Sequence, residues 1–113
     1  LPNPIADLAV TGVEPAPVIA RLYPPETQHD GTKVNVAVAP VEGAKQYKAW
    51  VSVYPDGRGA RALATGEKPD LFIKGLKPSV KFYFYATIIG ADGKESKPSK
   101  VRETVLQDEF PMK

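Results

Sequence analysis

Few residues in this 113-residue chain have both the type and the neighbours that catalysis requires. His29 is the only histidine, and the segment Gln28-His29-Asp30-Gly31 offers it no adjacent base or set of metal ligands. Asp30 is better explained as a turn residue. No serine lies in a Gly-x-Ser-x-Gly context. The chain has no cysteine, which excludes disulfides and thiolate metal sites.

Glycosidases need two carboxylates, and the sequence contains two candidate pairs. Asp92 and Glu95 share one loop, and Asp108 and Glu109 lie near the C-terminal end. Loops at the edge of a sheet provide no cleft that removes water from such pairs, so we expect both pairs to be solvated. The sequence therefore predicts no catalytic residues, no metal and no cofactor, and a protein that is not an enzyme.

The overall charge also excludes several classes of partner. The formal net charge is +2, and the 15 cations are scattered along the chain rather than clustered. Neither nucleic acid nor an anionic membrane surface is an expected partner. No apolar stretch approaches the ~20 residues needed to span a bilayer. Because Leu1 opens directly into a proline-rich segment, we expect a fragment of a longer polypeptide.

The elements that must position any functional residue are predicted to be β-strands. Apolar side chains alternate with period two, and the turn dipeptides Asp30-Gly31, Asp56-Gly57 and Asp92-Gly93 separate the runs. The predicted strands cover residues 18–23, 34–38, 47–54, 70–73, 82–89 and 100–106. Residues 59–65 fit a helical turn or a strand equally well. This pattern indicates an all-β, antiparallel two-sheet sandwich of about seven strands.

The N-terminal segment has a different composition. Six of the twelve prolines lie in the first 25 residues, and proline disfavours helix, so we expect an extended segment there. Residues 5–13 could form a strand that packs on a neighbouring domain. We divide the chain into a proline-rich linker or packing segment (1–17), the sandwich domain (18–106) and a C-terminal tail (107–113).

Four ordered segments of the sequence resemble fibronectin type III domains. The segment from Leu76 to Phe84 is similar to the family's Leu-x-Pro-x-x-x-Tyr pattern, and residues 93–99 are similar to the loop before its last strand. Residues 34–40 and 43–54 resemble its second and third strands. Two positions depart from the family: Val38 replaces a core tryptophan, and Phe82 replaces the tyrosine of the tyrosine corner. The resemblance implies an immunoglobulin-like sandwich in which the third and sixth strands are neighbours.

Side chains on these two strands are predicted to separate an inner face from an outer one. The inward sets are Tyr47, Ala49, Val51 and Val53 on one strand, and Phe82, Phe84, Ala86 and Ile88 on the other. The outer face then carries an aromatic patch with Lys48 nearby: Trp50, Tyr54, Tyr83 and Tyr85. The patch could be simple cross-strand pairing, a docking face for an adjacent domain, or a platform for stacking a sugar ring.

Our leading hypothesis for function is a non-catalytic accessory module of a larger secreted or surface protein, such as a bacterial carbohydrate-active enzyme. It would act as a spacer or domain-docking unit, and its partners would be adjacent domains of the same polypeptide. The isolated domain is expected to be a monomer. One alternative is a carbohydrate-binding module that holds polysaccharide on the aromatic patch. Another is an adhesion or receptor module that binds protein through the loop at 92–97.

Overall fold

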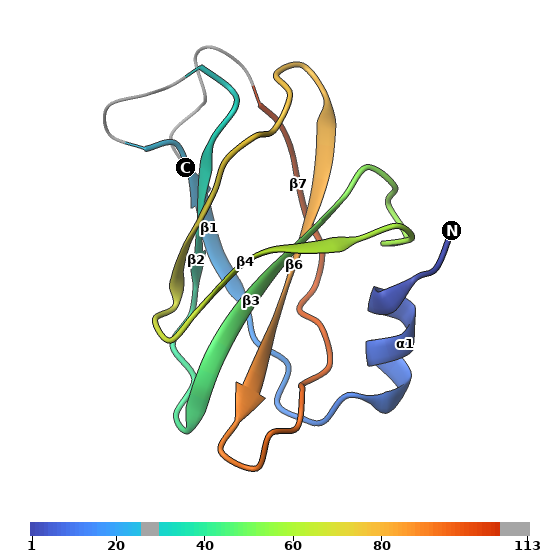
Figure 1. Ribbon diagram of the computed structural model, residues 1–113, viewed down its shortest axis with the longest axis vertical. Coiled ribbons are helices and arrows are strands. Elements are labelled where there is room, and N and C mark those ends of the chain that lie inside the picture. Colours follow the sequence, from blue (N-terminus) through green and yellow to red (C-terminus); the bar gives the residue numbers. More distant parts are fainter. Residues whose placement is uncertain (26–29, 107–113) are drawn as a thin grey trace.

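The computed structural model describes residues 1–25 and 30–106, which form two packed β-sheets and one short helix (Figure 1). One sheet has the strand order β1-β2-β5 and the other β4-β3-β6-β7, with all neighbours antiparallel. The elements are α1 (Pro4–Thr11), β1 (Ile19–Tyr23), β2 (Val34–Val38), β3 (Ala44–Ser52), β4 (Arg61–Gly66), β5 (Asp70–Ile73), β6 (Lys81–Gly90) and β7 (Arg102–Val105). The predicted all-β sandwich is thus confirmed, and residues 61–66 form a strand rather than a helical turn.

The space between the sheets is filled by the inward sets that two-residue alternation predicted. Tyr47, Ala49 and Val51 of β3 meet Phe84 and its inward neighbours on β6 in one buried cluster. Val53 is an exception, because it is 52% exposed and lies beyond the end of β3. The buried Ser52 ends the strand: its Oγ accepts a hydrogen bond from Tyr54 N (3.0 Å) and donates one to the carbonyl of Arg58 (2.7 Å). The chain turns there, and the alternation stops.

The three Asp-Gly turns share one geometry. In each, the aspartate Oδ1 accepts a hydrogen bond from the backbone N–H two residues later, at 3.0 Å in the turn of Asp30. Each following glycine has a positive φ, between 80° and 86°. The hydroxyl of Thr32 also donates to Asp30 Oδ1 (2.6 Å), and these two hydrogen bonds within the turn confirm that Asp30 is a turn residue. The same two donors lower the pKa of Asp30. His29 and the pair of carboxylates at 108–109 lie outside the described residues, as does the tail at 107–113.

Residues 95–99 run beside β6 where β7 does not reach, and two buried serines complete the hydrogen bonding there. Ser96 N donates to Ile88 O, and its Oγ accepts from Ile88 N (3.0 Å). Ser99 repeats the arrangement at Ala86, with Oγ 2.9 Å from Ala86 N. A side-chain oxygen thus replaces the carbonyl of a neighbouring strand at both positions. Both serines therefore stabilise the edge of β6, although they lie before the start of β7.

Replacing Ser99 by alanine should lower the free energy of unfolding by about 1–3 kcal/mol, because the buried N–H of Ala86 loses its acceptor. Chemical denaturation with an unchanged m-value would measure the loss. Ser79→Ala provides a comparison on the exposed turn before β6. A loss for Ser99→Ala no larger than a few tenths of a kcal/mol would contradict this role.

The N-terminal segment contains a helix, so the prediction of extended structure there is wrong for Pro4–Thr11, and residues 5–13 form no strand. The reason lies in the first four residues. Asn3 caps the helix by accepting a hydrogen bond from Ala6 N at 2.9 Å. Pro4 occupies the first helical position, where a missing N–H removes no helical hydrogen bond. Pro4 therefore favours the start of the helix rather than preventing it.

Candidate functional site

The predicted aromatic patch lies on the outer face of β3 and β6. Trp50 and Tyr85 are direct cross-strand partners, and Tyr83 stands opposite Ser52. The side chain of Trp50 is half-buried and lies outside the main core, so the register predicted for this strand is confirmed. Tyr85 is only 5% exposed, although it points away from the sandwich interior. Something outside the two sheets must cover it.

The cover is α1, which stands beside the four-stranded sheet (Figure 1). Ile5 forms a small buried cluster with Ala60 and Tyr85, and Trp50 and Tyr83 pack against that cluster. This cluster is separate from the main core between the sheets. The structure therefore brings three of the four predicted aromatic residues together, but under the chain's own N-terminal helix.

Tyr54 is the fourth predicted residue, and it lies apart from this cluster. It follows the end of β3, in the loop that connects β3 to β4, and its ring is partly exposed. The guanidinium of Arg58 lies over the ring, 4.4 Å from its centroid. The four residues thus form no single continuous platform, and their role in ligand binding stays a prediction.

The start of the N-terminal segment is fastened to the loop between β3 and β4. Gly59 N donates to the carbonyl of Pro2 at 2.7 Å, and Asn3 Nδ2 donates to the carbonyl of Asp56 at 2.9 Å. Ile5 lies directly against Gly57, where an added Cβ would be 2.8 Å from the Cβ of Ile5. A glycine at position 57 is therefore required both by its φ of +86° and by this close approach.

The end of the same segment is fastened to residues 95–97. Val13 N donates to Glu95 O (3.1 Å), and Lys97 N donates to Val13 O (2.9 Å), which makes a short parallel bridge. Gly12 lies so close to the backbone of Lys97 that a Cβ at position 12 would overlap it. Residues 1–13 are therefore held at both ends of α1.

A polar network continues the outer face next to the aromatic cluster. Trp50 Nε1 donates to Thr87 Oγ1 (2.9 Å), and Thr87 Oγ1 donates to Glu95 Oε2 (2.7 Å). Lys48 Nζ lies 3.2 Å from Glu95 Oε2 and 4.8 Å from the centroid of the Trp50 ring. The Glu95 side chain is only 23% exposed, so the prediction that the pair of Asp92 and Glu95 is solvated is wrong for Glu95. The bridge between Ile89 and Glu95 turns its carboxylate back onto the sheet.

Tyr85 combines an apolar ring with a hydroxyl that is bonded. Its hydroxyl donates to the carbonyl of Pro55 at 2.9 Å. Burial raises the pKa of the Tyr85 phenol above its ordinary value, and the nearby carboxylate of Asp56 raises it further. The environment of Tyr85 thus favours the neutral form of its phenol.

We expect the pKa of the Tyr85 phenol in the folded protein to lie above the ordinary value for tyrosine, chiefly because the ring is buried. Because the folded state favours the neutral form, the contribution of this group to stability is complete below the unfolded pKa. It is lost as pH rises through the folded pKa. The Cζ chemical shift of labelled tyrosine, followed against pH, measures the value. The variant Ile5→Ala should hydrate the ring and move the pKa of Tyr85 down towards its ordinary value, and no change in that variant would contradict α1 as the cause.

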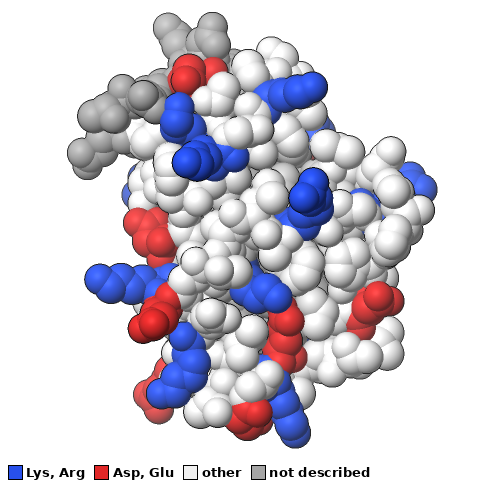
Figure 2. All heavy atoms as spheres, in the orientation of Figure 1, with Lys and Arg blue, Asp and Glu red and all other residues white. Residues whose placement is uncertain are grey.

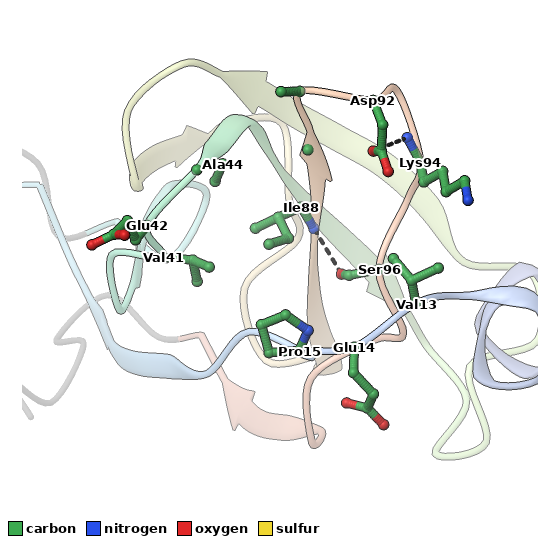
Figure 3. Close-up of a pocket in the computed structure, with 13 residues that line it drawn as sticks. Val13, Glu14, Pro15, Val41, Glu42, Ala44, Ile88, Asp92, Lys94 and Ser96 are labelled. Atoms are coloured by element: carbon green, nitrogen blue, oxygen red, sulfur yellow. Dashed lines mark hydrogen bonds between the residues drawn. The ribbon is translucent and has the colours of Figure 1, made fainter.

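A shallow hollow of about 370 Å³ lies at the end of the sandwich where the chain passes from α1 to β1. Val41, Ile88 and Pro15 form its apolar floor (Figure 3). The carboxylates of Glu14, Glu42 and Asp92 lie on separate sides of it and do not converge on one point (Figure 3). Within residues 1–25 and 30–106, no group of three or more potential ligands could hold a metal ion.

Figure 2 shows charged side chains of both signs on one face of the molecule. Lys and Arg side chains are interspersed with Asp and Glu over the lower part of the face in Figure 2. In the described part of the chain, no helix is both long and apolar enough to cross a membrane.

Asn3, Ile5 and Gly57 are the residues of this site that sequence reasoning missed. The signal that could have found α1 is local, since an Asn followed by Pro marks a helix start. Nothing in the sequence around Ile5 or Gly57 predicts that they meet, because they are far apart along the chain.

The fold has many solved counterparts. The fibronectin type III domain of human fibronectin type III domain containing protein 3 has a TM-score of 0.64 at 22% identity, over 86% of this chain and 89% of that one. An Fn3-like protein from Clostridium thermocellum has a TM-score of 0.58 at 17% identity, over 81% and 86%. The Yersinia enterocolitica family 28 exopolygalacturonase has a TM-score of 0.62 at 15% identity, over 84% of this chain and 21% of that one.

These likenesses agree with the antiparallel two-sheet sandwich described above. More narrowly, the chain has the fibronectin type III fold, as the resemblance of its sequence predicted. No protein-family model matches the chain. No curated protein matches it either.

Proposed function

We propose that this chain is a non-catalytic accessory module of a larger secreted or surface protein, in which it acts as a spacer or domain-docking unit. The observation that carries the proposal is the attachment of residues 1–13 to the outer face of the sandwich at both ends of α1. A flexible linker would let a preceding domain move freely. A segment fixed by backbone hydrogen bonds gives that domain a defined position instead.

The docked segment also supplies apolar surface for contact. Leu1 and Val10 are both more than 80% exposed on it. A neighbouring domain that covered these side chains would bury apolar surface without displacing α1. Solved structures with this fold occur within longer chains. The exopolygalacturonase above is one, and the twitchin kinase region of C. elegans is another, in which the match covers 18% of the twitchin chain. Both structures support the proposal that this chain is part of a multidomain protein. The exopolygalacturonase also supports the proposal that this larger protein is a carbohydrate-active enzyme.

The fixed position that residues 1–13 would give to a preceding domain can be tested by fusing a small rigid reporter domain directly before Leu1. NMR relaxation should show the reporter and the sandwich tumbling together in the native sequence. In the matched variant Ile5→Asp, which places a carboxylate in the apolar seat of Ile5, the two parts should tumble more independently. Equal independence of the reporter in both proteins would contradict the proposal.

The alternative of carbohydrate binding receives no support from the geometry of the aromatic patch. Tyr85 is covered by Ile5, and the ammonium of Lys48 lies over the ring of Trp50. Calorimetric titration with polysaccharides would detect such binding if it occurred. Protein binding through the loop at 92–97 would have to leave Glu95 and Lys97 in place, because both hold Val13.

A further inference from the structure

We propose that the groove beneath α1 is a peptide-binding site and that residues 1–13 are its ligand, held in cis. The α1 groove consists of the loop 56–60, the ring of Tyr85 and the backbone of residues 95–97. Its ligand class is a short peptide in which an Asn-Pro helix start is followed at once by a branched aliphatic residue. This inference goes beyond the proposed function, because a spacer needs only an attached segment and not a site that recognises it.

The first argument is that the sandwich core is complete without the segment. The main core cluster begins at Ile19 and contains no residue of the segment 1–13. The segment contributes one large buried side chain, that of Ile5, to a separate cluster. Clusters that share no core residues can open independently. A helix of eight residues is unstable alone in water, so α1 forms only on the groove.

The second argument is the shape of the seat for Ile5. Gly57 presents bare backbone to it, and a methyl group at position 57 would fill the space that the Ile5 side chain occupies. Ala60 and Tyr85 close the sides of the seat. The neighbours of Ile5 in this cluster are thus a glycine, an alanine and an aromatic ring, and the seat fits an aliphatic side chain.

The third argument is the double use of the Asn3 amide. Its Oδ1 caps α1 at Ala6 N, while its Nδ2 donates to the carbonyl of Asp56. An aspartate could cap the helix but has no N–H to donate. A serine or threonine would have to make both bonds from one oxygen atom. The groove thus distinguishes asparagine from the other good capping residues.

The remaining hydrogen bonds to the sandwich use only backbone atoms of the ligand. The carbonyl of Pro2 and both backbone groups of Val13 pair with the sandwich. Such contacts add affinity without selecting side chains, as in strand addition. Recognition of sequence therefore depends on Asn3, on Ile5 and on Gly12, where a Cβ would overlap the backbone of Lys97.

The affinity can be bounded from the attachment. A short linker gives a tethered segment an effective concentration on the order of 1 mM. For the docked form to dominate, the intrinsic Kd must then lie below about 1 mM. Binding of this strength is measurable when the segment is supplied as a free peptide.

The test is titration of a peptide of residues 1–13 into the full-length Ile5→Asp variant, whose own segment should vacate the groove. We expect saturable NMR shifts at the amides of Gly59 and Lys97 with a Kd below about 1 mM. A peptide carrying the same Ile5→Asp change should not bind, although an acidic residue in the first turn favours the helix itself. Absence of binding by the native peptide to a folded variant would overturn the proposal.

Two glycines provide a matched control for the groove. Gly57 and Gly43 both have a φ near +85°, but a Cβ at position 43 would meet nothing within 4 Å. In the Ile5→Asp background, Gly57→Ala should abolish peptide binding, whereas Gly43→Ala should retain it. Equal binding to both variants would overturn the assignment of the seat.

Hydrogen exchange on the native chain gives an independent measurement if the variant does not fold. The amides of Gly59 and Lys97 should exchange through one shared opening, at a lower free energy than the amides of β6. Exchange of both only through global unfolding would show that the segment is no separable ligand. A concentration-dependent dimer that exchanges residues 1–13 would support the site, since a second copy would then supply the same peptide.

Discussion

Replacing Phe84 by alanine should lower the free energy of unfolding by about 3–5 kcal/mol. Phe84 is the largest fully buried side chain among the described residues, and it lies on β6, between β3 and β7. Its ring packs 6.4 Å from that of Phe82, centroid to centroid. Truncation removes this apolar contact and leaves a cavity that two hydrogen-bonded neighbouring strands prevent from closing. Urea denaturation would show a lower midpoint at an unchanged m-value.

Phe72 is the matched control for this substitution. It is also a strand phenylalanine, but it lies on β5 with 48% of its surface exposed. Phe72→Ala should cost less than about 1 kcal/mol, because surface substitutions rarely cost more. Equal losses for the two variants would contradict the assignment of inner and outer faces on which the whole fold depends.

The strands could be predicted from the sequence because their signal is local. Two-residue alternation places Tyr47 and Phe84 in the core and Trp50 on the other face, and any antiparallel sandwich preserves that assignment. The alternation fails where the backbone departs from a regular strand. Val53 lies past the turn at Ser52, and a bulge between Ile19 and Arg21 interrupts the pattern in β1.

The site could be predicted only in part, because its cover comes from elsewhere in the chain. Outward-pointing aromatic residues look solvent-facing in a single sequence, and the burial of Tyr85 depends on Ile5, eighty residues earlier. The burial of Glu95 depends in the same way on Thr87 and Lys48. Alternation identifies which face a side chain points to, but not what lies on top of that face.

Two Lys–Glu ion pairs at the four-stranded sheet have the same N–O distance but differ in burial. Lys48 and Glu95 are separated by 3.2 Å with side chains 19% and 23% exposed. Lys81 and Glu103 are also 3.2 Å apart, but 51% and 53% exposed. Water screens the second pair and competes for its charges, so an exposed pair adds at most about 1 kcal/mol. The first pair also holds the hydroxyl of Thr87, which in turn accepts from Trp50.

Glu95→Ala should therefore destabilise the fold by about 2–4 kcal/mol, because it leaves the ammonium of Lys48 poorly hydrated and without its counter-charge. Glu103→Ala should cost no more than about 0.5 kcal/mol. Glu95→Gln keeps an acceptor for Thr87 and should fall between the two, which separates the hydrogen bond from the charge. Denaturation at low and at 1 M salt completes the comparison, because screening should weaken the exposed pair more than the covered one. Equal costs for the two alanine variants would show that the covered network contributes no more than an ordinary surface ion pair.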